Sequence, residues 1–334
     1  MTTSPRWARR PEGSNWGDFG PDDQLGTLNH LQPAQRLAAL AEIREGVCFS
    51  LSLPLDVPRA PVLNPRRRGP VIQPAEKNDL PVYRYPLERD VPGATDVVSD
   101  DRVALSPQYS TQWDALAHVG SLYDAHGSGE RQPTGYNGFA VSDARESPFR
   151  GTRELSITPM ATHGIQGRGV MVDLRAHFGD GFRRVSHAEL MAVMAQDGVE
   201  VRPGDVLCLH TGLADLALHL PDAELEQLRS SCCVLDGRDP ALLAWITASR
   251  IAAIAADNHA VEQRNHALEH GPGPLLPLHE HCLFKLGLPL GELWHLTPLA
   301  TWLRARGRHA FFLTAAPMYL PGLVGAPVNP LATV

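Results

Sequence analysis

The sequence lacks the marks of several protein classes. Acidic residues outnumber basic ones by 37 to 30, which gives a net charge of −7 and a pI near 6.1. There is therefore no excess of positive charge that would predict nucleic-acid binding. No apolar run reaches about 18 residues, the length of a membrane-spanning helix. Residues 1–7 contain no apolar core of about 7–15 residues, so we expect no secretory signal.

Cysteine is also scarce and unpatterned. The five cysteines are odd in number and show no C-x2-C spacing. This usage is typical of reduced thiols, so we predict a cytoplasmic protein. Cys282 lies near histidines and has two interpretations, a nucleophile or a buried structural thiol, of which the second is the commoner.

The remaining composition describes a soluble globular protein. The chain has 334 residues, of which 43% are hydrophobic and 20% charged, with a mean hydropathy of −0.18. Residues 1–15 are polar and contain proline, so we predict an N-terminal arm. No internal repeat is visible, and we expect a single domain over residues 16–334.

Periodicity predicts several elements in the first third of the chain. Pro33 suits the first turn of a helix that carries Leu37, Leu40 and Ile43 on one face and stops near Gly46. Residues 47–62 alternate apolar and small polar side chains, as one or two strands do. Residues 63–95 have no clear period, and we interpret them as a lid or a dimer arm, with the arginines at 66–68 in a solvated loop.

The second half of the sequence predicts alternating helices and strands. Buried strands are expected at 169–174, 206–212 and 251–256, and a capping box from Ser186 to Glu189 opens a helix. Thr297 and Pro298 are interpreted as the N-cap and first turn of a final helix. Residues 310–316 then form the last core strand. Composition and pattern alone establish only a mixed α and β fold.

The chemistry is concentrated in the stretch from Gln108 to His118. It places Gln108, Gln112, Asp114 and His118 within eleven positions. Asp114 and His118 share a face if they lie on a helical turn, and they converge equally well in a tight loop. A carboxylate holds a cation or orients a base, and imidazole exchanges protons near neutral pH. A structural hydrogen-bonded pair is the alternative interpretation.

The exact string resembles the signature of the cyclase family, which includes bacterial kynurenine formamidase and reads H-x-G-T-H-x-D-A-x-x-H. Asp114 and His118 match functional positions of that pattern, and Thr111 and Ala115 match as well. Two positions depart from it, because Gln108 and Gln112 stand where the family has metal-binding histidines. The T-Q-W-D variant is similar to a branch of longer proteins in the same superfamily.

A second block also resembles the family. Residues 277–292 include His279 and Glu292, thirteen positions apart, which match the late H-x12-E pattern that completes the family's metal site. His281 is the alternative histidine. Helical spacing in this block predicts a helix that ends at Gly287, followed by an extended segment that delivers Glu292.

The resemblance implies an α/β fold of the swivelling β/β/α type, with a mixed β-barrel-like core flanked by helices and assembled as a homodimer or homotetramer. It implies a divalent cation held by Asp114, His279 and Glu292, with Gln112 adding an amide oxygen. Amide oxygen in place of imidazole makes the site harder, so manganese or magnesium is favoured relative to zinc, or metal is lost.

The function implied is hydrolysis of an amide, lactone or cyclic imide of an aromatic or heterocyclic small molecule, with His118 and Asp114 as catalytic groups. A metal-independent cyclase or dehydratase of secondary metabolism, of the polyketide type, is the alternative, and a binding protein with a vestigial site is the third. Predicted substrate-binding residues are Gln108, Trp113, Tyr136, His259 and Trp294. His259 has an alternative role as a strand cap, and the two tryptophans have one as core residues.

Overall fold

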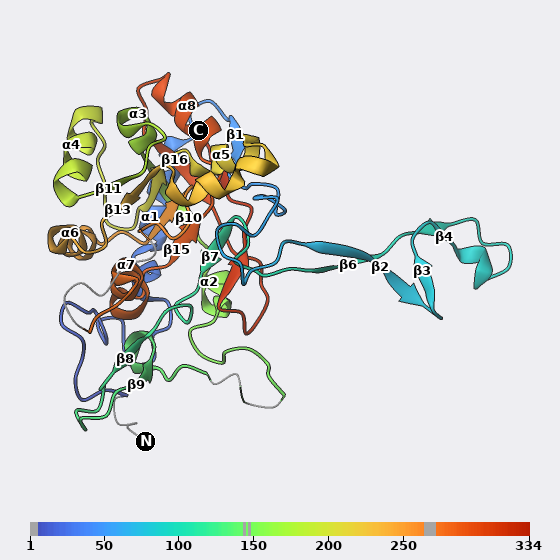
Figure 1. Cartoon of the computed structure of the whole chain (residues 1–334), viewed down its shortest axis with the longest axis horizontal. Coiled ribbons are helices and arrows are strands. Elements are labelled where there is room, and N and C mark those ends of the chain that lie inside the picture. The colour runs from blue at the N-terminus through green and yellow to red at the C-terminus, as the bar shows by residue number, and fades with distance from the viewer. Residues whose placement is uncertain (1–5, 143–144, 146–147, 264–271) are drawn as a thin grey trace.

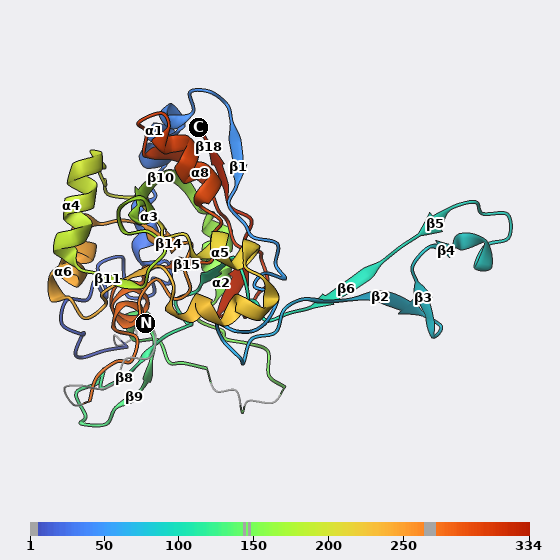
Figure 2. The ribbon, with the colours of Figure 1, turned by 45° about the horizontal axis from the view of Figure 1, so that its top comes forward.

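The fold is organised around one strongly curved nine-stranded sheet with helices on its outer faces (Figures 1 and 2). We describe a computed structural model in which residues 6–142, 145, 148–263 and 272–334 are placed. The strand order is β1 (Cys48–Ser50), β18 (Leu331–Thr333), β16 (Ala310–Thr314), β10 (Gln166–Asp173), β12 (Val206–His210), β14 (Ala253–Ala256), β15 (Leu290–Glu292), β7 (Gln112–Asp114) and β17 (Gly325–Pro327). This mixed α/β half-barrel confirms the predicted fold class.

The central strands β10, β12, β14 and β15 pair in parallel, and the flanking strands pair antiparallel. Every residue of β12 and β14 is buried, which explains why both strands are continuous apolar runs in the sequence. The α-helices are α1 (Pro33–Ala39), α2 (Ile157–His163), α3 (Leu174–Phe178), α4 (His187–Asp197), α5 (Leu213–His219), α6 (Pro240–Ser249), α7 (Pro277–His279) and α8 (Thr297–Arg304).

Shorter elements complete the body. The 3-10 helices are η1 (Gly26–His30), η2 (Leu40–Glu42), η3 (Leu87–Arg89), η4 (Tyr136–Gly138) and η5 (Asp222–Ser230), and α7 continues into the π-helix η6 (Glu280–Leu286). Two small sheets pair β8 (Ser121–Tyr123) with β9 (Gln132–Thr134) and β11 (Arg183–Val185) with β13 (Cys233–Leu235). None of the helices in the placed part of the chain is long and apolar enough to cross a membrane.

Apolar side chains cover both faces of the sheet. Leu207 and Leu209 of β12 join the cluster that contains Trp16 and Phe284. The alternate residues of the same strand, such as Cys208, join a second cluster built around Trp113 and Trp294. Successive side chains of a strand point to opposite faces, so a strand buried on both sides is apolar along most of its length; in β12 only the last residue, His210, is polar.

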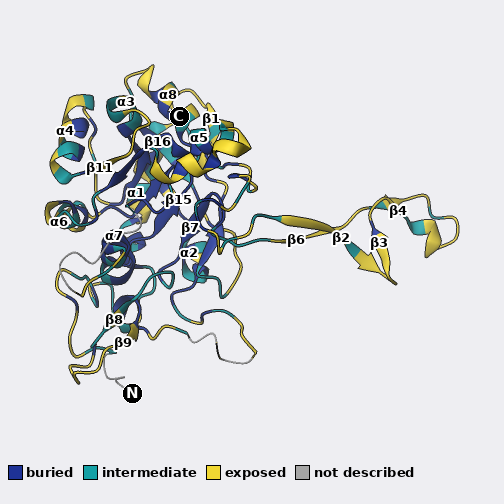
Figure 3. Ribbon diagram, viewed as in Figure 1, coloured by how far each residue is buried: buried dark blue, intermediate teal, exposed yellow. Residues whose placement is uncertain are grey.

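The segment predicted as a lid or dimer arm forms a long projection. The predicted range, residues 63–95, contains β2 (Val71–Lys77), β3 (Leu80–Val82) and β4 (Tyr85–Pro86). The projection continues beyond it through β5 (Val97–Val98) and β6 (Asp101–Ala104). Figures 1 and 2 show this arm pointing away from the body, and Figure 3 shows that most of it is exposed. In this position it does not cover its own chain, which favours the arm over the lid.

Most of the predicted elements are present, and their signals are visible in the structure. The capping box opens α4, with both of its hydrogen bonds formed between Ser186 and Glu189. Strands β10, β12 and β14 lie at or within a few residues of the predicted ranges, and Gly287 ends η6 with φ +60°. Residues 6–15, the placed part of the predicted N-terminal arm, contact the body: the rings of Trp7 and Trp16 are 5.8 Å apart.

Three local predictions are wrong. The helix from Pro33 ends at Ala39 and not near Gly46, so Leu40 and Ile43, expected on one face with Leu37, lie beyond it. The three side chains are 70% (Leu37), 48% (Leu40) and 38% (Ile43) exposed. Thr297 does not cap α8, because its hydroxyl contacts His210 Nε2 at 3.0 Å and Leu296 occupies the N-cap position. Strand β16 is not the last strand of the core, because β17 and β18 follow it into the same sheet.

Candidate functional site

Two neighbouring strands place three polar side chains on one face of the sheet. Strand β7 carries Gln112 and Asp114, and their spacing of two directs both to the same face. Strand β15 runs antiparallel beside it, with Glu292 opposite Gln112. The sequence Q-W-D therefore projects its polar side chains into the site and Trp113 into the apolar cluster behind it.

The third component comes from the helix that precedes β15. His279 is the last residue of α7, and the carboxylate of Glu262 accepts hydrogen bonds from its backbone N–H and its Nδ1, both at 2.8 Å. The same carboxylate accepts the backbone N–H of Leu278 at 3.0 Å. With Nδ1 occupied, Nε2 of His279 points toward Glu292, 3.4 Å from Oε1.

Asp114, His279 and Glu292 thus form one cluster, with one potential ligand atom from each within 4.8 Å of the others. All three side chains are at most 2% exposed. The cluster includes His279, whereas His281 lies elsewhere, with its Nε2 2.9 Å from the hydroxyl of Thr247. The role of His279 as a metal ligand stays a prediction.

Gln112 bridges the two carboxylates of the cluster. Its Nε2 donates to Asp114 Oδ1 at 3.3 Å and to Glu292 Oε2 at 3.1 Å. Its Oε1 and the Oδ2 of Asp114 are buried without a hydrogen-bond partner among the described residues. Buried oxygens without partners are costly, so the cluster is complete only when something positively charged or hydrogen-bearing reaches them.

The charges of the cluster are strongly coupled. Burial, together with the nearby carboxylate of Glu292, raises the pKa of Asp114 to about 8. Burial also opposes ionisation of Glu292, but its hydrogen bond with His279 and the nearby His259 and Arg67 hold its pKa well below the usual range. The two carboxyl groups therefore share one proton near neutral pH, and Asp114 holds it.

The pKa values of His279 and His118 are shifted in opposite directions. Burial alone lowers the pKa of His279, but hydrogen bonds with Glu262 and Glu292 outweigh it and raise the pKa to about 10. Burial lowers the pKa of His118 to about 4, although Glu292 opposes the shift. His118 follows β7 in a turn, with its Nε2 3.8 Å from Asp114 Oδ2, so the loop interpretation of the D-x3-H pair is correct.

Two contributors to the site were missed in the sequence. Arg67, expected in a solvated loop, is only 15% exposed. Its Nη1 donates to the backbone oxygen of Gln108 at 2.7 Å, lies 3.5 Å from His259 Nε2 and 3.8 Å from Glu292 Oε2. Glu262, which orients His279, follows a buried strand as a single glutamate and carried no motif. Only the polar cluster after β14 pointed toward it.

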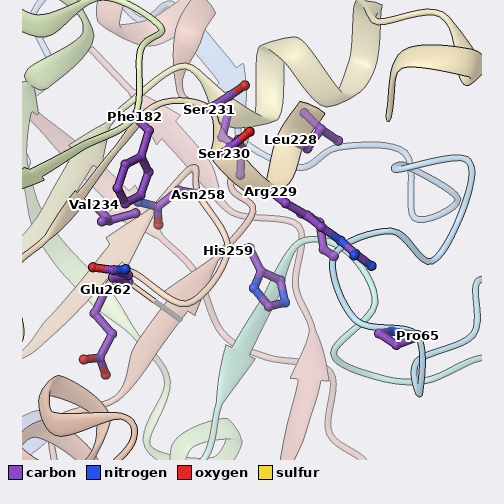
Figure 4. A pocket seen from close by; sticks show the side chains of 13 residues that line it. Pro65, Phe182, Leu228, Arg229, Ser230, Ser231, Val234, Asn258, His259 and Glu262 are labelled. Carbon is purple, nitrogen blue, oxygen red and sulfur yellow. The ribbon is translucent and has the colours of Figure 1, made fainter. Parts of the chain in front are cut away.

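A cavity of about 490 Å³ adjoins the cluster (Figure 4). Two of its lining residues, His259 and Glu262, contact the cluster or its neighbour Arg67. The wall is mixed, with apolar groups such as Phe182 and Val234 beside polar ones. His259 therefore lies where a substrate-binding residue is expected.

The other predicted substrate-binding residues do not line this cavity. Trp113, Tyr136 and Trp294 are all 0% exposed, and their polar atoms are paired with Ala315 O, Asp23 and Gln112 O respectively. The two tryptophans are core residues, which was the alternative interpretation of both. Tyr136 is likewise a core residue, so the expectation that it lines the pocket is not supported.

Gln108 and Cys282 need separate comment. Gln108 is half-buried, and its side chain packs against Gly325, so a contact with substrate stays a prediction. Cys282 is 0% exposed, and burial raises the pKa of its thiol well above the usual value. A protonated, inaccessible thiol is a poor nucleophile, so the structural interpretation is correct.

The sequence matches the model of the Cyclase family, described as "Putative cyclase", over residues 49–263. The chain belongs to the Cyclase family. A solved structure described as a novel cyclase is 32% identical, covers 96% of this chain and 97% of its own, and superposes with a TM-score of 0.76. A search of curated proteins gave no match.

More distant solved structures share the fold. Isatin hydrolase A from Labrenzia aggregata is 16% identical, with 90% of this chain and 98% of its own covered and a TM-score of 0.55. Isatin hydrolase A from Ralstonia solanacearum is 13% identical, with 89% and 94% covered and a TM-score of 0.53. At these identities the likeness concerns the architecture alone.

The donor set of this Cyclase-family chain fits a divalent cation. Two carboxylates and one imidazole are available, and the partnerless Oδ2 of Asp114 supplies an open oxygen. Ligand atoms around one ion with bonds of about 2.0–2.3 Å lie up to about 4.5 Å apart. The three potential ligand atoms lie within 4.8 Å of one another, so they can converge on one ion. Gln112 presents its nitrogen to the carboxylates, so its oxygen becomes a ligand only if the amide turns over.

Proposed function

We propose that the protein is a metal-dependent hydrolase that opens an amide, lactone or cyclic imide bond of an aromatic or heterocyclic small molecule. The observation that carries the proposal is the buried Asp114, His279 and Glu292 cluster beside a half-apolar cavity of about 490 Å³. A few convergent polar groups in a mostly apolar pocket are typical of small-molecule enzyme sites.

Asp114, His279 and Glu292 would hold the cation, with manganese or magnesium suited to the oxygen-rich donor set and zinc as the alternative. Bound there, a cation would supply Lewis-acid activation of the substrate carbonyl and of the attacking water. Glu262 accepts one hydrogen bond from the ring Nδ1 of His279 and one from its backbone N–H, and so keeps Nε2 directed to the site.

His118 transfers protons and Arg67 stabilises negative charge beside the cluster. With its pKa near 4, the imidazole of His118 is neutral at physiological pH, so Nε2 accepts a proton from water and then returns it to the leaving group. The guanidinium of Arg67, held by Gln108 O, stabilises negative charge that develops on the substrate oxygen. Both side chains are partly accessible, as contact with a substrate requires.

Activity measurements with and without metal test the proposal. Aryl formamides, lactones and cyclic imides are assayed with manganese, with magnesium, with zinc and with chelator, and the purified protein is analysed for metal content. We expect hydrolysis of at least one class and its loss on chelation. Absence of bound metal together with chelator-resistant activity would contradict a role for the cation.

A metal-independent cyclase or dehydratase remains the second candidate, and one observation favours it. Without a cation, Asp114 carries a proton at neutral pH while His118, 3.8 Å away, is neutral. This pair is an acid next to a base, as a dehydration requires. Turnover of a polyketide-like substrate in the presence of chelator would favour this candidate.

For its assembly, we propose that the protein forms a homodimer through the projecting arm. Apolar side chains on the arm are widely exposed, among them Ile72 at 71% and Val97 at 60%. Exposed strands with apolar side chains are normally paired or covered. Replacing residues 71–104 by a short Gly-Ser linker is expected to give a monomer by light scattering, and an unchanged oligomer would contradict the arm's role.

A further inference from the structure

The cavity beside the metal-ligating cluster contains a buried acceptor that the proposed chemistry leaves unused. Asn258 follows β14, is 2% exposed and lines the cavity. Its Nδ2 donates to the backbone oxygen of Cys233 at 3.0 Å. A carbonyl oxygen only accepts, so this contact fixes the orientation of the amide: the nitrogen faces Cys233, and Oδ1 is the atom left over.

Oδ1 of Asn258 has no hydrogen-bond partner among the described residues. A second carbonyl oxygen of the cavity wall, Oε1 of Gln263, is in the same condition. Buried polar atoms are rarely left unpaired in folded proteins, and those that are often mark a ligand contact. Figure 4 shows Asn258 on the cavity wall with Phe182 and Val234 beside it.

We propose that Asn258, assisted by Gln263, accepts a hydrogen bond from an N–H group of the substrate and so distinguishes an N–H group from a ring oxygen at the same position. This inference rests on the proposed hydrolase function and assigns the residues that recognise the group next to the bond to be opened. An amide N–H donates a hydrogen bond to Oδ1, whereas the ring oxygen of a lactone only accepts and meets an acceptor.

The surrounding charges favour a neutral N–H over an ammonium group. Arg229 lines the same cavity, and Arg67 lies against His259 at its edge. The carboxylate of Glu262 is already engaged by His279 and by two backbone N–H groups. A cationic ligand would therefore meet like charges without a free carboxylate, while a neutral amide meets two neutral acceptors.

Binding of matched probes tests the assignment without depending on turnover. Isatin and phthalimide are compared with N-methylisatin and N-methylphthalimide by calorimetry on the metal-loaded protein. We expect each N–H probe to bind about tenfold more tightly than its N-methyl partner, as the loss of one buried hydrogen bond implies. Asn258→Leu is expected to remove most of this difference.

Two further variants distinguish N–H recognition from a folding defect and from a change in the shape of the cavity. Gln263→Leu, at a half-buried position, is expected to reduce the N–H preference and provides the test if Asn258→Leu does not fold. Val234→Ala removes an apolar wall group and should change the affinities of both members of a pair alike.

Hydrolysis of the same probes distinguishes this inference from the proposed function. A protein that hydrolyses none of them but still prefers N–H probes retains the recognition role and loses the hydrolase proposal. Equal affinity for N–H and N-methyl probes, absence of binding by all four, or a preference unchanged by both Asn258→Leu and Gln263→Leu would overturn the recognition role.

Discussion

Binding of a divalent cation should release about two protons at pH 7. In the metal-free protein the pKa of Asp114 is about 8 and that of His279 is about 10, so both groups are protonated at neutral pH. A cation requires both ligands without their protons. Because both pKa values lie above the working pH, binding weakens as the pH falls, by about a hundredfold from pH 7 to pH 6.

Calorimetric titration with Mn²⁺ in buffers of different ionisation enthalpy counts these protons directly. Metal at about 100 times its Kd should also stabilise the fold by about 2.7 kcal/mol. With 334 residues and about 2.1 cal/mol/K for each, this raises Tm by about 4 °C. His118→Ala is the control, because His118 is not a ligand and is neutral at pH 7, and its proton count should match the native protein. Release of no protons would refute the assignment of Asp114 and His279 as ligands.

Three substitutions separate the roles of the groups around the cluster. His118→Ala should lower kcat about 10²- to 10⁴-fold with little change in metal affinity. His126→Ala, at an exposed histidine, is the control and should leave kcat unchanged. Equal kcat for both variants would show that His118 takes no part in the reaction. Glu262→Gln should weaken Mn²⁺ binding about 10- to 100-fold, measured by calorimetry, because His279 loses its carboxylate partner, and unchanged affinity would contradict that role. Arg67→Lys should lower kcat more than it alters KM, because lysine keeps the charge but loses the fixed guanidinium geometry, and a change in KM alone would indicate a binding role.

The polar residues of the cluster were predictable because each lies in a string that resembles a pattern of the Cyclase family. Asp114 and His118 share one string, and His279 and Glu292 share another. The strand parity of Q-W-D then determines which side chains face the site. Arg67 was not predictable, because it lies in a proline- and arginine-rich run without period. Its place depends on where the base of the arm meets the body.

Local sequence patterns also fail to predict the cavity and the exposure of apolar side chains on the outer surface. The cavity is lined by residues 63, 65, 182, 213, 228–231, 234, 258, 259, 262 and 263. No local pattern in the sequence connects these distant segments. Leu37, Leu40 and Ile43 have the spacing of one apolar helix face, but α1 ends at Ala39 and all three side chains are exposed within this chain. Periodicity indicates that a face is apolar, while burial depends on the rest of the fold or on a partner.

Trp113 and Trp294, which were expected to contact the substrate, support the strands of the site from the apolar core. Trp294 donates from Nε1 to the backbone oxygen of Gln112 at 3.1 Å and packs edge-on against Trp113, with ring centroids 5.0 Å apart. Gly291 of β15 packs closely against Trp294 and Ala255. An added Cβ at Gly291 would come within 2.8 Å of Trp294 Nε1 and 3.0 Å of the side chain of Ala255. A side chain at position 291 would push β15 away from this packing. Because Glu292 is the next residue, the close approach of its carboxylate to Asp114 depends on the absence of that side chain. The core under the sheet therefore sets the distances between ligands on its other face.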